Sequence, residues 1–226
     1  MKITWWTTVG PLNSMLLASR EGEHHMFQVP SITTLLFPLI FWVGIYSLDN
    51  ALTIWTVQAL RQPPFAGSIT FEGSLELNPI FESEVEQTRR FGPRFRLMLI
   101  ASSIYLAFAW YFSNSVLGSD GLSSFAFGAL FLLEFAVIIR HLQNVAIVRA
   151  ANDGFSLQGT LHTPRPVSFR MSAAYFFGFA SLFLVLGILT RSWFILGGFF
   201  ACVIQSFRNS RQARAAAKAI PVSPGN

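Results

Sequence analysis

Four ionisable side chains stand inside segments that are otherwise apolar, and they are the first candidates for chemistry. Asp49 lies in the apolar run that begins near residue 32, while Glu134, Arg140 and His141 lie in the run that begins near residue 122. A charged group at membrane depth is costly, so such residues usually mark an ion pathway, a proton relay or a paired charge. A histidine can change its charge near neutral pH. The chemistry that this cluster predicts is a proton or cation relay.

Helical spacing groups the polar residues onto faces. Asp49 and Thr53 are four residues apart, so they share one face of a helix. The later segment carries a broader polar stripe made of Glu134, Arg140, His141 and Asn144. We therefore predict one intramembrane polar cluster contributed by two helices.

Two interpretations of this cluster are open at this stage. A pairing of Asp49 with Arg140 or with His141 is geometrically reasonable. In the structural interpretation, Asp49–Arg140 is a buried ion pair that fixes the register of two helices. In the functional interpretation, Asp49, Glu134 and His141 form a relay that faces a cavity. Arg140 could instead extend its long side chain to the membrane surface.

Other kinds of site find no support in the sequence. The chain has one cysteine, Cys202, and no HExxH motif, so neither a metal site nor a bound cofactor is predicted. It has no GxSxG motif for a nucleophilic serine and no glycine-rich phosphate loop. We expect no catalytic residues, and the sequence leans away from an enzyme without excluding one.

The elements that must position these residues are transmembrane helices. The 226 residues are 52% hydrophobic and only 12% charged, which is about half of the charged fraction of a soluble domain. A bilayer core needs roughly 20 helical residues per span. The sequence predicts an all-α, polytopic transmembrane helical bundle within residues 30–208, with five spans at about 32–60, 97–117, 122–148, 171–189 and 193–207.

The number of spans depends on the last apolar stretch. The apolar residues 171–207 are interrupted by Arg191. If the stretch forms a tight hairpin of two spans, Arg191 lies at its tip among the lipid headgroups, where an arginine costs little free energy. The alternative is four spans, in which the final segment is an interfacial helix.

Basic residues predict the orientation. One set of flanks holds twelve of them: Arg61, Arg89, Arg90, Arg94, Arg96, Arg149, Arg165, Arg170, Arg208, Arg211, Arg214 and Lys218. The opposite set holds three: Lys2, Arg20 and Arg191. Because cytoplasmic flanks are enriched in Lys and Arg, we expect the N-terminus outside and the C-terminus in the cytoplasm. The expected location is the cell membrane, specifically a prokaryotic inner membrane.

Three segments lie outside the predicted spans. Residues 1–29 form an extracytoplasmic segment, and residues 209–226 form a basic cytoplasmic tail that begins as a helix extension. Residues 61–96 form the longest cytoplasmic loop, acidic in its centre and basic at its end. This loop is either a solvated linker or a small docking surface, and its residues 82–90 are expected to form a surface helix.

A short pattern in the first half of the chain is familiar. It reads Asp49-x3-Thr53, followed in the next loop by Glu76-x-Asn78-Pro79. Over about residues 40–115 the chain resembles a group of small uncharacterised prokaryotic membrane proteins. The resemblance implies that these five residues are neighbours. Asn78 would then cap a helix that starts at Pro79, and Glu76 would fold back toward the membrane surface.

The sequence supports three functions in decreasing order. The first is a non-enzymatic structural or accessory component of a membrane complex, with helix faces and the loop at 61–96 contacting a protein partner or a second copy of the chain. The alternative is a small transporter or channel that uses the polar cluster. An intramembrane enzyme comes third. The lipid bilayer is an expected partner, and nucleic acid is not, because the basic residues flank apolar spans instead of forming a patch with aromatics.

Overall fold

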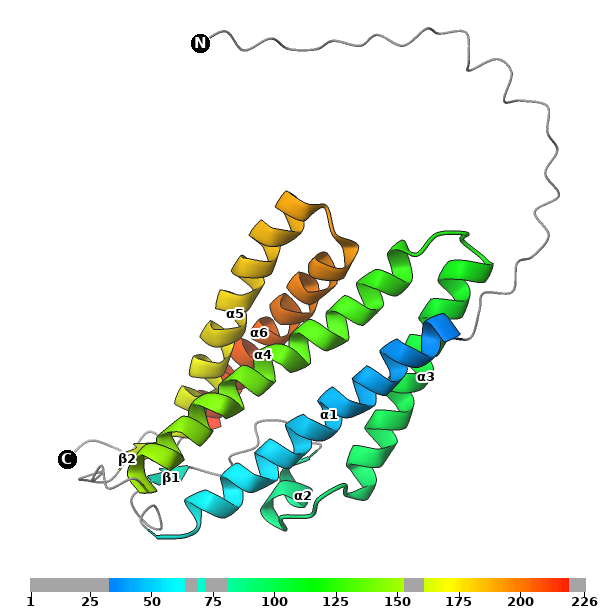
Figure 1. The fold of residues 1–226 in the computed structure, drawn as a ribbon. Coiled ribbons are helices and arrows are strands. Elements are labelled where there is room, and N and C mark those ends of the chain that lie inside the picture. Colours follow the sequence, from blue (N-terminus) through cyan, green and yellow to red (C-terminus); the bar gives the residue numbers. More distant parts are fainter. Residues whose placement is uncertain (1–32, 64–68, 72–80, 153–160, 220–226) are drawn as a thin grey trace, which may run out of the picture.

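The architecture is a bundle of long helices, shown in Figure 1. The structure is a computed structural model that describes residues 33–63, 69–71, 81–152 and 161–219. In chain order its elements are α1 (Thr33–Leu60), β1 (Ile69–Phe71), α2 (Glu82–Glu86), α3 (Pro93–Ser115), α4 (Gly121–Asn152), β2 (Leu161–Thr163), α5 (Arg165–Thr190) and α6 (Trp193–Ala219).

Helix α4 is the centre of the bundle. It packs against α1 and α3 on one side and against α6 on the other, and α5 packs mainly against α6 (Figure 1). Small residues allow the closest of these contacts: a Cβ on Gly128 would collide with the backbone oxygen of Phe194, and a Cβ on Gly197 with that of Phe125. The contact between α4 and α6 therefore brings two backbones together, as in many membrane helix pairs.

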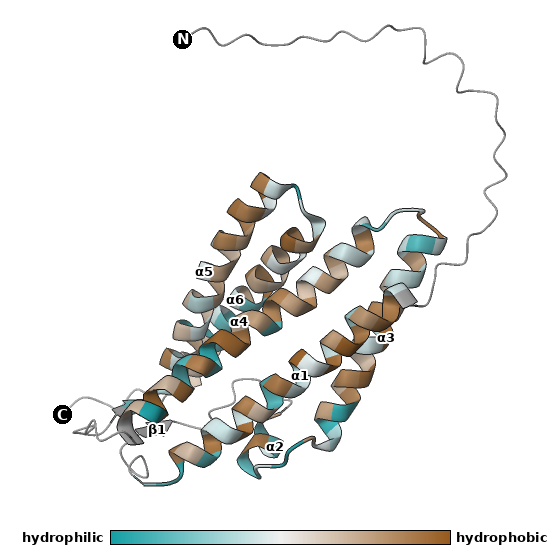
Figure 2. Ribbon diagram, in the orientation of Figure 1, coloured by the Kyte–Doolittle hydropathy of each residue, from teal (hydrophilic) through white to brown (hydrophobic). Residues whose placement is uncertain are grey.

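The outward surface of the long helices is apolar, as the brown ribbon in Figure 2 shows. Phe37, Ile104, Phe177 and Leu189 are each more than 60% exposed. Four helices, α1, α3, α4 and α5, are long and apolar enough to cross a membrane. The prediction of a helical membrane protein is confirmed at this level. Helix α6 is not among the four, so the fifth span and the orientation stay predictions.

The helix boundaries differ from the sequence prediction mainly at the polar ends. Helix α3 begins four residues earlier than expected, because Gly92 and Pro93 form a favourable helix start. Helix α5 likewise begins at Arg165, with Pro164 as its N-cap. Helix α6 runs to Ala219, so residues 209–219 of the predicted tail are the expected helix extension.

The described residues of the loop at 61–96 contain two short elements, β1 and α2. Strand β1 pairs in parallel with β2 from the loop between α4 and α5, with Thr70 opposite His162. This two-stranded sheet was not predicted, since strands of three residues give no periodic signal. The expected helix at 82–90 is wrong in its length, because α2 ends at Glu86 and Thr88 adopts a left-handed backbone conformation.

Helix α2 is docked onto the bundle. Val85, 3% exposed, packs with Ile54 and Val57 of α1. The carboxylate of Glu84 accepts hydrogen bonds from the backbone N–H of Arg94 at 2.7 Å and of Phe95 at 3.4 Å, so it caps the N-terminus of α3. Through these contacts α2 connects α1 to α3. The connection lies at the end of the bundle that also contains the polar cluster.

Candidate functional site

A cavity of about 250 Å³ lies between the long helices. Each of α1, α3, α4, α5 and α6 contributes to its wall, and Phe81, next to α2, contributes as well. Its polar lining consists of Asp49, Ser102, Glu134, Arg140, His141, Ser172, Gln205, Arg208 and Asn209. The cavity is therefore lined by both apolar and polar side chains, and it lies within a bundle whose outer surface is apolar.

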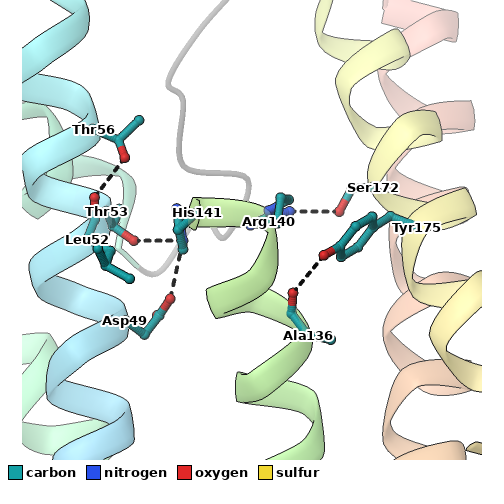
Figure 3. Close-up of polar contacts among 9 residues, drawn as sticks. All are labelled: Asp49, Leu52, Thr53, Thr56, Ala136, Arg140, His141, Ser172 and Tyr175. Carbon is teal, nitrogen blue, oxygen red and sulfur yellow. Dashed lines mark hydrogen bonds and ion pairs between the residues drawn. The ribbon is translucent and has the colours of Figure 1, made fainter. Parts of the chain in front are cut away.

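The contact between Asp49 and His141 joins α1 to α4. His141 Nε2 lies 3.2 Å from Asp49 Oδ1 and 3.1 Å from Thr53 Oγ1, as Figure 3 shows. The side chain of His141 is only 7% exposed and that of Asp49 is 21% exposed. Of the two pairings considered from the sequence, the structure contains Asp49 with His141. The pairing of Asp49 with Arg140 is wrong.

The surroundings of His141 constrain where its proton sits. Nε2 lies 3.2 Å from Asp49 Oδ1, which accepts no hydrogen bond within the described residues, and a hydrogen on Nε2 would be favoured over a bare lone pair beside an ionised carboxylate. The other ring nitrogen, Nδ1, is buried and has no hydrogen-bond partner in the described part of the chain. In the tautomer with the hydrogen on Nε2, a neutral His141 has a free lone pair on Nδ1, and protonation there would create an imidazolium beside Asp49.

Arg140 points in the opposite direction from its neighbour His141. Figure 3 shows it extending from α4 toward α5, where its Nη1 donates a hydrogen bond to Ser172 Oγ at 3.1 Å. Its Cζ lies 6.0 Å from the centre of the Phe176 ring, a cation–π contact. Consecutive residues point to different sides of a helix, so α4 presents His141 to α1 and Arg140 to α5.

The remaining predicted cluster residues divide into two groups. Glu134 lies two turns before His141 on the same face of α4, and it lines the cavity. Asn144 is half-buried on α4 and is not among the lining residues of this cavity in the described structure. Glu76, Asn78 and Pro79 fall within residues 72–80, outside the described residues.

A polar network on α5 and α6 was missed by the sequence analysis. Asn209, 2% exposed, donates from Nδ2 to Ser172 Oγ at 2.9 Å, and Gln205 donates from Nε2 to Asn209 Oδ1 at 3.4 Å. Ser206 donates to the backbone oxygen of Ala173 at 2.8 Å. The available signal was that Gln205 and Asn209 are four residues apart on one helix face. It was overlooked because residue 209 was assigned to the tail.

Aromatic side chains close the other part of the wall. Trp42 is 1% exposed and donates from Nε1 to Ser102 Oγ at 2.9 Å, which joins α1 to α3. Trp42 also stacks on Tyr46, with ring centres 5.2 Å apart, and both residues line the cavity. A cavity with aromatic walls and a few fixed polar groups has the general character of a small-molecule site.

Comparisons with known proteins add no assignment. No family model, no curated protein and no solved structure matches this chain. Among the described residues there is also no group of three or more metal-ligating side chains. The resemblance found in the sequence therefore stays a prediction.

Proposed function

We propose that the protein is a small multi-pass membrane transporter that binds a polar solute in the cavity and takes up a proton at the Asp49–His141 pair. The observation that carries this proposal is that the polar cluster lines a cavity of about 250 Å³. A pair that only fixed helix register would be expected in a closed, fully packed core. A solute site requires the space that this cluster borders.

The proton-binding role is supported by the geometry of His141. Its Nε2 is hydrogen-bonded to Thr53 Oγ1 and lies 3.2 Å from Asp49 Oδ1, while Nδ1 is buried without a hydrogen-bond partner in the described structure. A proton arriving at Nδ1 would convert His141 into a cation beside the Asp49 carboxylate, and its departure would restore the neutral ring. This exchange changes the charge of the cavity wall by one unit in each cycle.

We further propose five spans, with the C-terminus in the cytoplasm of a prokaryotic cell. Helix α6 packs along α5 in the antiparallel direction, with Ser206 beside Ala173 and Asn209 beside Ser172. An interfacial helix would lie across the bundle, not along a spanning helix. The structure also pairs β1 with β2 and Glu82 with Arg165, at 3.2 Å between Oε2 and Nη2, so both intervening loops share one end. This agrees with the strongly basic set of flanks.

The transport proposal is tested by proton flux in proteoliposomes that contain a pH-sensitive dye. A mixture of small polar solutes is added outside, and internal acidification is followed for the wild type, Asp49→Asn, and Glu86→Gln. Glu86 is an exposed carboxylate on α2 and serves as the matched control. We expect solute-dependent acidification in the wild type and in Glu86→Gln, and its loss in Asp49→Asn. Equal flux in all three, or none above empty liposomes, would refute the proposal.

An accessory role is the second candidate function, because small residues on the outer face of α5 would allow another helix to pack closely against it. Ala174, Gly178 and Ser181 are exposed on its outer face, and a Cβ on Gly178 would meet nothing within 4 Å. Small residues of this kind permit close helix contacts in membranes. Copurification of a partner at fixed ratio in gentle detergent, lost in Gly178→Leu but not in Gly44→Leu, would favour this role. Gly44 has equally open space on α1.

A further inference from the structure

Arg140 carries a positive charge that no acidic side chain balances in the described structure. Its contacts there are the hydrogen bond to Ser172 Oγ at 3.1 Å and the contact with the Phe176 ring at 6.0 Å. The pair of Asp49 with His141 lies on the other side of α4 (Figure 3). The hydrogen bond to Ser172 uses one of the five N–H donors of the guanidinium, and Arg140 is one of the residues that line the cavity.

The wall around Arg140 is rich in hydrogen-bond donors. Ser172 Oγ already accepts hydrogen bonds from both Arg140 and Asn209, so it adds no strong acceptor to the cavity. Asn209 and Gln205 present amide groups from α6, and Arg208 brings a second guanidinium to the lining. These donors can bind negatively charged oxygen atoms, and the same lining also holds the carboxylates of Asp49 and Glu134.

A guanidinium at membrane depth without a counter-charge is expensive, and a bound anion would remove that cost. A guanidinium recognises carboxylate and phosphate groups through two parallel hydrogen bonds. The cavity volume of about 250 Å³ accommodates a small organic anion or a single headgroup. Phe176 contributes an aromatic face 6.0 Å from Arg140 Cζ and also lines the cavity.

We propose that Arg140 anchors an anionic oxygen group, a carboxylate or a phosphate, in this cavity. The inference rests on the proposed function, since it names the solute class that the transporter would take. The anion would lie on the α5–α6 side, and a proton bound at His141 would lie across the cavity on the α1 side. An anion that enters together with a proton leaves the net charge of the filled cavity unchanged.

The anionic group could belong to a soluble anion or to a lipid headgroup, and the experiment separates the two. Purified protein is placed in nanodiscs of phosphatidylcholine, and binding of acetate, succinate, glutamate and inorganic phosphate is measured by calorimetry. A second set of nanodiscs contains phosphatidylglycerol, and the shift in thermal unfolding is recorded. Each measurement compares the wild type with Arg140→Gln and with the control Arg149→Gln, an exposed arginine on the same helix that does not line the cavity.

A soluble anion that binds the wild type and Arg149→Gln, and binds Arg140→Gln roughly tenfold to hundredfold more weakly, supports the inference. Stabilisation by phosphatidylglycerol alone, lost only in Arg140→Gln, supports it with a headgroup as the anion. Absence of binding by every probe, or equal effects of the two substitutions, would overturn it. If Arg140→Gln does not fold, the same binding measurements are made on Arg140→Lys and on the control Arg149→Lys. Lysine keeps the charge but cannot form the two parallel hydrogen bonds, so weaker binding in Arg140→Lys alone supports the inference and equal binding overturns it.

The failure of this inference can be told apart from failure of the transport proposal. If proton flux depends on Asp49 but anion binding is unchanged in Arg140→Gln, the transport proposal is supported and the anion site at Arg140 is refuted. Anion binding that depends on Arg140 without any proton flux would leave a binding protein and refute transport.

Discussion

His141 Nε2 lies 3.2 Å from Asp49 Oδ1, and this contact links the central helix α4 to α1 across a polar cavity. The two residues are 92 positions apart in the sequence. Thr53, one turn after Asp49, contacts the same nitrogen at 3.1 Å. The Asp-x3-Thr spacing therefore has a physical meaning: it places a carboxylate and a hydroxyl on one helix face so that both can hold a single imidazole.

The first prediction concerns the strength of this pair. In a double-mutant cycle with Asp49→Asn and His141→Gln, we expect a coupling of about 0.5–3 kcal/mol, because each single change leaves a buried partner without its contact. Unfolding in mixed micelles measures the free energies. The control cycle combines Asp49→Asn with Glu86→Gln, whose effects should add. A coupling no larger than that of the control would contradict the contact.

A second prediction tests the cap on α3. Glu84→Ala should lower the free energy of unfolding by about 1–2 kcal/mol, because the backbone N–H groups of Arg94 and Phe95 lose their acceptor. Glu86→Ala on the same short helix should have little effect, since Glu86 is exposed. Thermal unfolding in detergent compares the two. Equal stabilities would show that α2 does not cap α3.

Third, because α4 and α6 are in close contact, we expect Gly→Ala substitutions at different positions to change the free energy of unfolding by very different amounts. Gly128→Ala should destabilise the bundle by about 1–3 kcal/mol, because the new Cβ collides with the backbone oxygen of Phe194. Gly178→Ala should be neutral or stabilising, since its Cβ meets open space and alanine favours a helix. The same unfolding assay applies. If Gly128→Ala leaves the free energy of unfolding unchanged, the two helices are farther apart than in this structure.

A fourth prediction addresses the fifth span. Single cysteines are introduced at Ser119, Arg191, Glu86 and Lys218, and intact cells are treated with a membrane-impermeant thiol reagent. Cys202 is fully buried and gives little background. With five spans, positions 119 and 191 react from outside, while 86 and 218 react only after lysis. Labelling of position 218 from outside would favour four spans and an interfacial α6.

Much of the fold could be predicted because apolar length is a strong and local signal. The starts of α1 and α6 and the ends of α1 and α5 fall within a residue of the predicted spans. The boundaries that differ lie at the start of α3 and of α5 and at the end of α4 and of α6, in polar turns that hydropathy does not detect. The pair β1–β2 was missed because its strands are three residues long and join loops distant in the sequence.

The candidate site could be predicted in part, for a related reason. Charged residues in apolar runs stand out, so Asp49, Arg140 and His141 were identified before the structure. Which of them pair depends on the rotation of α4 about its axis, and the sequence does not fix that rotation. Ser172 and Asn209 were missed because neutral polar residues near helix ends resemble ordinary interfacial residues until tertiary packing buries them.

The central claim is that the polar cluster lines a space that water and solutes reach. The most direct test is the reactivity of a cysteine at Ser102, which lines the cavity, compared with one at its exposed, outward-facing neighbour Ala101. A thiol must ionise to react, and only water allows this. In bilayers, we predict that a small polar thiol reagent modifies Ser102→Cys and leaves Ala101→Cys intact. If neither cysteine reacts, the cluster is sealed from water, and the structural interpretation of Asp49 and His141 replaces the transport account.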